Sequence, residues 1–493
     1  MKTLVHKILP TAMPALMACG WLIIVNSAHG NESTSSIYMP STTAATGKPI
    51  PLKPGPHLFL DDFLIAGSTN IIRKVNVPQR DPAIPNPIVT GKEDGCFQPF
   101  FSVVRDPANG RFRIWYGIRR DDFSQIRSHI GYMESTDGIH WMRPHRVLAD
   151  PSEIQFGTSV IDDGPAFARP AERFKYAWWY EDGLRIATSP DGLAWTPIST
   201  NVLISHNHDI TGIHWDPLRQ CYVATVSFYI AGSVWSGTRR ITKQSTSADL
   251  IHWTEPWTVV APNDKLDQGE TQFYAMDGYL ARGDLIVGMV KVLRDDLKAD
   301  QPPDPREAYG IGYTALAWTR DGEHWTRDRE KFFDRHPQQG EWDHAHTWID
   351  DQLLVGDEVY LYYAGYQSGH KVNRFEERQI GLVKMKRDRY VAREASDGGG
   401  NFRTPLVTLD ADAMTLNMDA PTGEVTVQIL GENDKPVDGF TRKDCAPISG
   451  DIPAAPVRWK KPLALLKGKP IRLEFFLENA RLFAFDLVDS PAK

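Results

Sequence analysis

The chain has 493 residues, a formal net charge of −7, and 41% hydrophobic and 24% charged residues. This length is enough to bury one large hydrophobic core and a second, smaller one. The negative balance, without any lysine-rich run, argues against binding to nucleic acid or to an anionic membrane surface. We therefore expect a folded protein with two hydrophobic cores that binds neither nucleic acid nor an anionic membrane surface.

The N-terminus has the pattern of a secretory signal over residues 1–30. Lys2 and Lys7 precede an apolar stretch that is broken by two prolines and followed by small residues up to Gly30. This pattern predicts cleavage near Gly30, a secreted or periplasmic protein, and no membrane span after removal of the signal. The alternative is a single membrane anchor. Residues 31–56, whose first part is rich in Ser and Thr, are predicted to form a flexible linker.

Only three cysteines follow the signal: Cys96, Cys221 and Cys445. They allow at most one disulfide bond, so we do not expect disulfides to hold the fold together.

One pattern recurs five times between about residue 100 and residue 392: an apolar strand, a turn, an aromatic strand, and a strand that usually ends in Ser-x-Asp-Gly-x-x-Trp. The five turns read STDGIHW (135–141), SPDGLAW (189–195), SADLIHW (247–253), TRDGEHW (319–325) and the degenerate KMKRDRY (384–390). Several short strands within a repeat of this size are typical of propeller blades. We predict an all-β fold with a five-bladed β-propeller of four-stranded blades over 57–395.

The turn motif itself is predicted to be architectural. Asp-Gly supplies the positive φ of a tight turn, and the Asp side chain binds its own backbone. Asp137, Asp191 and Asp321 are therefore poor catalytic candidates.

A second all-β unit is predicted after the flexible sequence SDGGGN. Alternating strands such as MTLNMDA, EVTVQIL and IRLEFFL follow it. Residues 398–490 are predicted to form a β-sandwich.

Function is expected at the entrances to the innermost strands, which converge on one funnel at one face of a propeller. These entrances read KEDGCFQP (92–99), SEIQFG (152–157), SHNHD (205–209), LDQGE (266–270) and EWDHAH (341–346). Glu270 directly precedes its strand, and Asp209 ends its own entrance segment.

Five blades, a following sandwich and carboxylates at the entrances resemble the secreted five-bladed glycoside hydrolases of families 32, 43, 68, 117 and 130, over roughly residues 57–490. The resemblance is at superfamily level, because the fructosidase tract Trp-Met-Asn-Asp-Pro-Asn is absent. In the family 43 order, a base aspartate, a pKa-modulating aspartate and an acid glutamate follow one another. The resemblance therefore implies Asp94, Asp209 and Glu270 for these three roles.

Cleavage of a glycosidic bond needs one carboxyl group that carries a proton and one that is ionised. We expect Glu270 to be the acid, with a pKa raised by the nearby charge of Asp209. Asp94 is the expected base, and Glu93 and Asp62 are the alternatives.

The remaining candidates are expected to bind a carbohydrate substrate. Histidines gather at two entrances, and aromatic rings there can pack against a sugar face. The substrate-binding candidates are Asp62, His208, Trp342, Asp343, His344 and His370. The histidine pairs lack the spacing of a helical zinc motif, so no cofactor is expected to be required, although a structural divalent cation is compatible with the sequence.

The leading hypothesis is thus a secreted glycoside hydrolase that degrades an oligo- or polysaccharide. One alternative is a non-catalytic propeller that binds glycans. Another is a sialidase-like exo-glycosidase, which needs three arginines around a carboxylate; Arg73, Arg119 and Arg374 are the nominated residues. The loop 294–309, rich in proline and charge, is expected to overhang the funnel.

Overall fold

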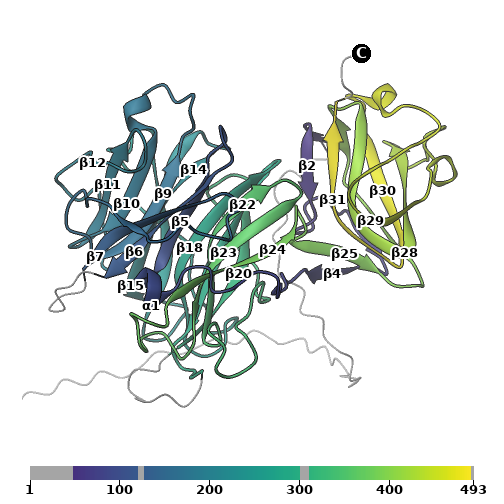
Figure 1. Cartoon of the computed structure of the whole chain (residues 1–493). Helices are drawn as coiled ribbons and strands as arrows, with labels where there is room; N and C mark the ends of the chain where they lie inside the picture. The colour runs from purple at the N-terminus through teal and green to yellow at the C-terminus, as the bar shows by residue number, and fades with distance from the viewer. Residues whose placement is uncertain (1–47, 120–126, 300–309, 490–493) are drawn as a thin grey trace, which may run out of the picture. The chain divides into compact units, whose positions relative to one another are not determined.

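The computed structural model describes residues 48–119, 127–299 and 310–489, and this part of the chain is almost entirely β-structure (Figure 1). Its α-helical content is the single turn α1 (Gly91–Asp94), beside short 3-10 segments at Pro170–Glu172, Arg442–Asp444 and Leu463–Leu466. The all-β prediction is confirmed. The predicted signal over 1–30 lies outside the described residues, as does most of the predicted linker.

Five groups of antiparallel strands follow one another along the chain. The first group contains β5 (Cys96–Arg105), β6 (Phe112–Arg119), β7 (Ser128–Ser135) and β8 (Arg146–Val147). The second contains β9 (Phe156–Asp162), β10 (Phe174–Trp179), β11 (Gly183–Ser189), β12 (Thr196–Pro197) and β13 (Ile204–Ser205). The third contains β14 (Thr211–Asp216), β15 (Cys221–Ala231), β16 (Thr238–Ser247) and β17 (Trp257–Val260). The last two are β18 (Thr271–Arg282), β19 (Leu285–Arg294), β20 (Ile311–Thr319) and β21 (Thr326–Arg327); and β22 (His346–Val355), β23 (Glu358–Tyr366) and β24 (Gln379–Lys386).

The first strands of these groups form a closed ring. Strand β5 packs against β9, β9 against β14, β14 against β18, β18 against β22, and β22 against β5 again (Figure 1). A ring of five inner strands, each the first strand of an antiparallel sheet, is a five-bladed β-propeller. The predicted propeller is confirmed.

Side chains join neighbouring blades where the backbones do not pair. Ser102 Oγ accepts a hydrogen bond from Val160 N (2.8 Å), and Ser159 Oγ accepts one from Ile213 N (2.9 Å). Between the last blade and the first, the Asp350 carboxylate accepts from Phe101 N (2.6 Å). These bonds satisfy backbone groups that would otherwise be buried without a partner.

The outer edge of the fifth blade is completed by residues that precede the first blade. Gln79 bridges to Lys384, and Val89 bridges to Ile380, both in β24. The segment around Asp61 and Asp62 lies beside a different sheet. That segment follows β2 (Gly55–Leu58), which pairs with the last strand of the chain.

The repeated turns have the predicted architectural role. Ser135 Oγ accepts from Asp137 N and Gly138 N, and Asp137 Oδ1 accepts from Ile139 N and His140 N. The same set of bonds forms at the turns around Asp191, Asp249 and Asp321. These bonds lower the pKa of each of the four carboxyl groups.

The second unit is a β-sandwich, as predicted, and one long strand builds both of its layers. The first half of β28 (Ala413–Gly431) pairs with β31 (Ala480–Val488), and its second half pairs with β30 (Ile471–Glu478). Where β28 pairs with β29 (Ile448–Pro456), the register shifts between Ala420 and Val425, and Pro421 and Gly423 of β28 lie in this interval. The other strands of this sheet are β1 (Ile50–Leu52), β2, β3 (Gly67–Thr69), β4 (Ile72–Val75), β25 (Val391–Ala395), β26 (Gly400–Arg403), β27 (Val407–Leu409) and β29 (Ile448–Pro456).

Strand pairing therefore moves the predicted domain boundaries. Residues 50–58 were predicted as linker or propeller, yet β1 and β2 belong to the sandwich sheet, as do β3, β4 and β25 within the predicted propeller range 57–395. The reason is pairing between distant segments, for example β1 with β27 and β4 with β25.

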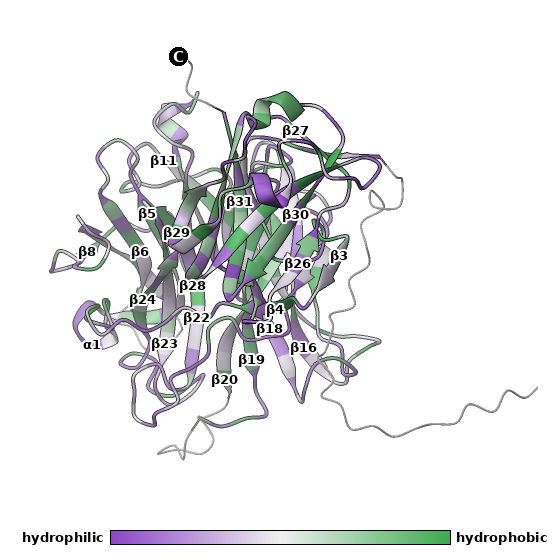
Figure 2. Cartoon of the chain, turned by 90° about the vertical axis from the view of Figure 1, so that its right-hand side faces the viewer, coloured by the Kyte–Doolittle hydropathy of each residue, from purple (hydrophilic) through white to green (hydrophobic). Residues whose placement is uncertain are grey.

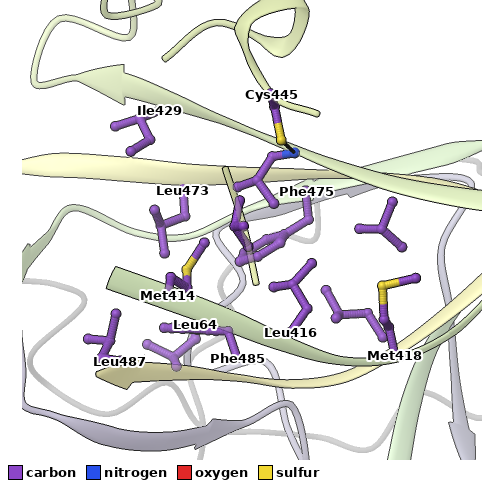
Figure 3. Packing of buried hydrophobic residues seen from close by; sticks show 14 of the residues in the cluster. Leu64, Met414, Leu416, Met418, Ile429, Cys445, Leu473, Phe475, Phe485 and Leu487 are labelled. Carbon is purple, nitrogen blue, oxygen red and sulfur yellow. Dashed lines mark hydrogen bonds between the residues drawn. The ribbon is translucent and has the colours of Figure 1, made fainter. Parts of the chain in front are cut away.

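The sandwich has a core of its own. Met414, Leu416, Phe475 and Phe485 are buried between its layers, and the nearby Cys445 Sγ accepts a hydrogen bond from Val427 N (3.4 Å; Figure 3). Strand β30 alternates buried and less buried residues, and Figure 2 shows green and purple segments mixed on this sheet. Cys96, Cys221 and Cys445 are all free thiols.

Buried charges lie along the propeller axis, beside a cavity of about 440 Å³. Lys291 is fully buried and forms ion pairs with Asp277 (2.9 Å) and Asp350. Asp351 accepts hydrogen bonds from Val103 N and Gln352 N, each 2.9 Å long, and burial raises its pKa to about 7. The fold therefore favours the protonated form of Asp351.

We predict that Asp351→Asn changes how stability depends on pH. In the wild type, the raised pKa makes the free energy of unfolding decrease as pH rises from the ordinary carboxyl range to about 7, by up to about 4 kcal/mol. Asn resembles the protonated carboxyl group and does not titrate, so the variant should gain stability relative to the wild type between pH 4 and pH 8. Urea unfolding at several pH values measures this effect. The exposed Asp397→Asn variant is the control and should show no such gain. If the difference in the free energy of unfolding between Asp351→Asn and the wild type stayed constant across pH, the prediction would be contradicted.

Candidate active site

The candidate site lies where the inner strands of the propeller begin. Strands β14, β18 and β22 start there, and the β15–β16 and β23–β24 connections return to the same end. Because adjacent strands of a blade are antiparallel, the end of β19 also lies beside the start of β18, with Arg294 opposite Thr271. Side chains distant in sequence therefore meet at this end of the propeller.

Stacked aromatic rings form the centre of the site. Tyr274 in β18 stacks on Trp348 in β22, with centroids 4.7 Å apart. The His370 ring lies 5.0 Å from Tyr274, and the His346 ring lies 4.7 Å from Tyr366. This arrangement fixes the histidine rings through packing rather than through hydrogen bonds.

Several buried polar atoms in this cluster have no hydrogen-bond partner among the described residues. They are Nδ1 and Nε2 of His346, Nδ1 of His370, Oη of Tyr366, Oδ1 of Asp209 and Nε of Arg378. Native proteins leave few buried polar groups unpaired, and a group of them at one place indicates bound water or a ligand. We call the residues of this group, together with His208, Arg240, Tyr274 and Asp295, the entrance site.

One side of the entrance site is a chain of polar contacts. Asp209 Oδ1 lies 3.3 Å from His208 Nε2. His208 Nε2 accepts a hydrogen bond from Arg240 Nε (2.9 Å). Arg240 forms an ion pair with Asp295 (3.1 Å) and donates to Gln272 Oε1 (2.7 Å). Arg240, Asp295, His370 and Lys371 line a pocket of about 220 Å³.

Burial sets the protonation of these groups. It lowers the pKa of His208 to about 3, with a further contribution from Arg240. It also holds the pKa values of His346 and His370 well below the ordinary histidine range. For Asp209, burial raises the carboxyl pKa against the opposing effect of Arg240. At neutral pH the histidines are therefore neutral, and burial shifts the equilibrium of Asp209 toward its protonated form.

Three of the predicted site residues meet in the entrance site: Asp209, His208 and His370. Glu270 lies at the start of β18 with an exposed side chain that makes no hydrogen bond or ion pair to another described residue. Burial raises the pKa of Asp209 and the nearby arginines oppose this rise. No hydrogen bond or ion pair joins Asp209 to Glu270 in the described part of the chain.

Asp94 has a different environment from the one predicted for a base. It is almost fully buried, and Arg143 donates to both of its carboxylate oxygens, at 2.9 and 2.8 Å. Thr90 N also donates to Asp94 Oδ2 (2.8 Å). Glu93 is exposed and lies 3.6 Å from the same arginine. These contacts give Asp94 a structural role that the sequence could not show, because Arg143 is 49 positions away.

The other predicted substrate contacts are engaged elsewhere. Asp62 is 61% exposed and pairs with Arg393 of the sandwich sheet. Asp343 is buried and accepts from Arg80 Nε (2.8 Å) and Tyr363 Oη (3.0 Å).

Trp342 and His344 are also used by the fifth blade itself. Trp342 stacks on Tyr363 and covers Gly365, where an added Cβ would lie 2.3 Å from the indole ring. His344 Nδ1 donates to the backbone carbonyl of His336 (2.7 Å).

Sequence analysis missed Tyr274, Tyr366, Arg240, Asp295 and Arg378 as site residues. They lie within or after strands whose register the sequence does not give. The sequence did place His346 in an entrance segment, two residues before Trp348, and this spacing puts both side chains on one face of a strand. Of the predicted overhanging loop 294–309, residues 300–309 lie outside the described residues, while Asp295 contributes to the pocket.

The described residues include no group of three His, Cys, Asp or Glu side chains arranged to hold a metal ion. Nor is any helix in the described ranges long and apolar enough to cross a membrane.

No family model matches the sequence. Two uncharacterized proteins of Mycobacterium tuberculosis are 29% identical to it over 121 and 125 residues, which is 23% of this chain and 37% of each relative. The match thus spans little more than a third of the length of these relatives.

The chain is also similar to solved structures of carbohydrate-active proteins. They include a GH43 β-xylosidase/α-arabinofuranosidase from a compost metagenome (11% identity, TM-score 0.41, 66% of this chain and 98% of that chain) and an exo-inulinase from Aspergillus awamori (11%, 0.38, 81% and 99%). A third is an N-acetylgalactosamine deacetylase from F. plautii in complex with blood group B trisaccharide (17%, 0.40, 65% and 96%). All three TM-scores lie below 0.5, and all three identities are 17% or lower.

We predict that Asp94→Asn reduces stability without affecting carbohydrate binding. The change removes the charge that pairs with Arg143, and because that arginine is about one-third exposed we expect a loss of about 2 kcal/mol in the free energy of unfolding. Glu93→Gln is the matched control and should change stability by less than about 0.5 kcal/mol. Denaturant unfolding and sugar titration of the folded variants test this; a stable Asp94→Asn protein that no longer binds sugar would restore Asp94 to the site.

Proposed function

We propose that the protein is a glycoside hydrolase and that the entrance site is where it binds and cleaves its substrate. The observation that carries this proposal is the convergence of unpaired buried polar atoms on stacked aromatic rings beside a pocket. Sugars present many hydroxyl groups that need donors and acceptors, and apolar faces that pack on aromatic rings. Neutral His346 and His370, each with a free ring nitrogen, suit the hydroxyl groups.

In this proposal Asp209 is the general acid. A carboxyl group that donates a proton near neutral pH must have a raised pKa, and burial provides this for Asp209. Its side chain is 26% exposed while Oδ1 is buried, so part of the carboxyl group remains accessible to a substrate. Asp209 thus takes the role that the sequence analysis gave to Glu270.

The second, ionised carboxylate that cleavage requires is Asp295. It accepts hydrogen bonds from Arg240 (3.1 Å) and Gln272 (2.6 Å), and its side chain is 27% exposed. The contacts Asp209–His208–Arg240–Asp295 hold the two carboxyl groups in one connected network. Glu270, exposed at the start of β18, is the alternative for this role.

Secretion belongs to the same proposal. A signal over residues 1–30 would deliver the enzyme to the periplasm or the medium, where oligo- and polysaccharides are available. The substrate is then an extracellular glycan.

We predict that Asp209→Asn lowers turnover by roughly two to four orders of magnitude while sugar binding survives. Asn keeps the size of the side chain but cannot donate a proton. A substrate with a good leaving group needs less protonation, so an aryl glycoside should be partly spared. In the wild type, kcat should decrease as pH rises through the raised pKa of Asp209, and the variant should lose this limb. Steady-state kinetics against pH measures all three effects.

Asp182→Asn is the matched control, because this exposed aspartate precedes β11 and has no side-chain bond to another described residue. Its kinetics should equal those of the wild type. If Asp209→Asn kept near-normal turnover of an unactivated glycoside, Asp209 would not be the acid. If the wild type bound glycans and cleaved none in a broad oligosaccharide screen, the protein would be a glycan-binding propeller.

A further inference from the structure

The entrance site and the neighbouring Lys371 and Arg374 contain more positive charge than the ion pairs there neutralise. Arg240 pairs with Asp295, but no ion pair to a carboxylate of the described residues is formed by Lys371, Arg374 or Arg378. All three belong to the connection between β23 and β24. The excess is notable because the whole chain has a net charge of −7.

Arg378 is held rigidly by backbone atoms. It donates to the carbonyl oxygens of Phe97 (2.9 Å) and His370 (2.8 Å), and its guanidinium lies 5.0 Å from the centre of the Tyr366 ring. Its residue exposure is only 4%, and its Nε is buried without a partner. A buried cation that binds only neutral oxygens carries an uncompensated desolvation cost, which a bound anion would offset.

Arg374 lies close to the same centre. It interacts electrostatically with Arg378, Tyr274, Tyr366 and Asp209, and burial together with Arg378 lowers its pKa. No hydrogen bond or ion pair joins it to another described residue. Lys371 lines the 220 Å³ pocket together with Arg240, Asp295 and His370. Arg240 and Lys371 therefore line the pocket, and Arg378 lies over the Tyr366 ring.

We infer that the entrance site is specific for sugars that carry an anionic group, either the carboxylate of a uronic or other sugar acid or a sulfate ester, and that Arg374 and Arg378 bind this group. A planar guanidinium forms paired hydrogen bonds with carboxylate or sulfate oxygens, and such bonds are stronger than those between neutral groups. Lys371 adds a second charge at the pocket. The inference rests on the proposed function only for the placement of the sugar, since binding can be measured without cleavage.

Two of the three arginines nominated from sequence contact groups outside the entrance site. Arg73 pairs with Asp328 (2.5 Å), and Arg119 lies over the Phe375 ring, 4.4 Å from its centre. Of the three, Arg374 alone interacts electrostatically with Asp209 and Tyr274 of the entrance site. Arg240, Arg374 and Arg378 all act on Asp209, and Arg240 is already paired with Asp295.

The test is calorimetric titration of the full-length protein with matched sugars. One series pairs uronic acid oligosaccharides with neutral oligosaccharides of the same linkage, and the other pairs sulfated with unsulfated oligosaccharides. We expect the wild type to bind the charged member of at least one pair about tenfold or more tightly. Arg374→Gln and Lys371→Gln should each reduce this preference, and added salt should weaken it. Arg146→Gln, an exposed arginine on the outer strand β8, is the control that should retain it.

The series that shows the preference identifies the anionic group. Three results would overturn the inference. The wild type could bind charged and neutral members with equal affinity, or it could bind no charged sugar. The preference for charged sugars could also stay unchanged in both Arg374→Gln and Lys371→Gln. The result is separable from the proposed function. Arginine-dependent binding without cleavage would contradict the hydrolase function and support the anion site. Cleavage of neutral glycosides without a preference for charged sugars would support the hydrolase function and contradict the anion site.

Discussion

The closed ring of five inner strands is the constraint on which the rest of this protein depends. Neighbouring inner strands do not form a continuous backbone ladder, so side chains such as Ser102, Ser159 and Asp350 supply the missing bonds between blades. Buried Lys291 balances part of the acidic charge near the axis. Polar side chains around Lys291 thus fill one part of the propeller interior, while aromatic and histidine residues lie at the starting end of the inner strands.

The character of the entrance site follows from this geometry. Several polar atoms at the strand starts lack hydrogen-bond partners among the described residues, and aromatic rings pack beside them. Burial then makes the histidines neutral and favours a protonated Asp209. The same desolvation makes unpaired Arg378 costly in the absence of an anion. Acid chemistry and anion binding thus have one physical origin in this site.

The sequence predicted much of the fold because its signals are local. The Asp-Gly turns are built within seven residues, and even the third copy, where Leu250 replaces glycine, keeps the turn with a φ of +69°. Ring closure by residues 79–89 and the pairing of β1 and β4 with C-terminal strands join segments hundreds of positions apart. For the site, the entrance segments include His208 and Asp209, which the structure places beside Arg240. The pairing of Asp94 with Arg143 could not be predicted, because a carboxylate beside a strand looks the same in sequence whether or not an arginine pairs with it.

The central claim is that the unpaired polar atoms of the entrance site bind a sugar. A crystal structure of Asp209→Asn in complex with its tightest-binding oligosaccharide tests it most directly. The account predicts a sugar ring packed near Tyr274 and Trp348, with hydroxyl groups within hydrogen-bond distance of His346, His370 and Tyr366. A sugar bound at another surface, with these atoms making no contact to it, would contradict the account.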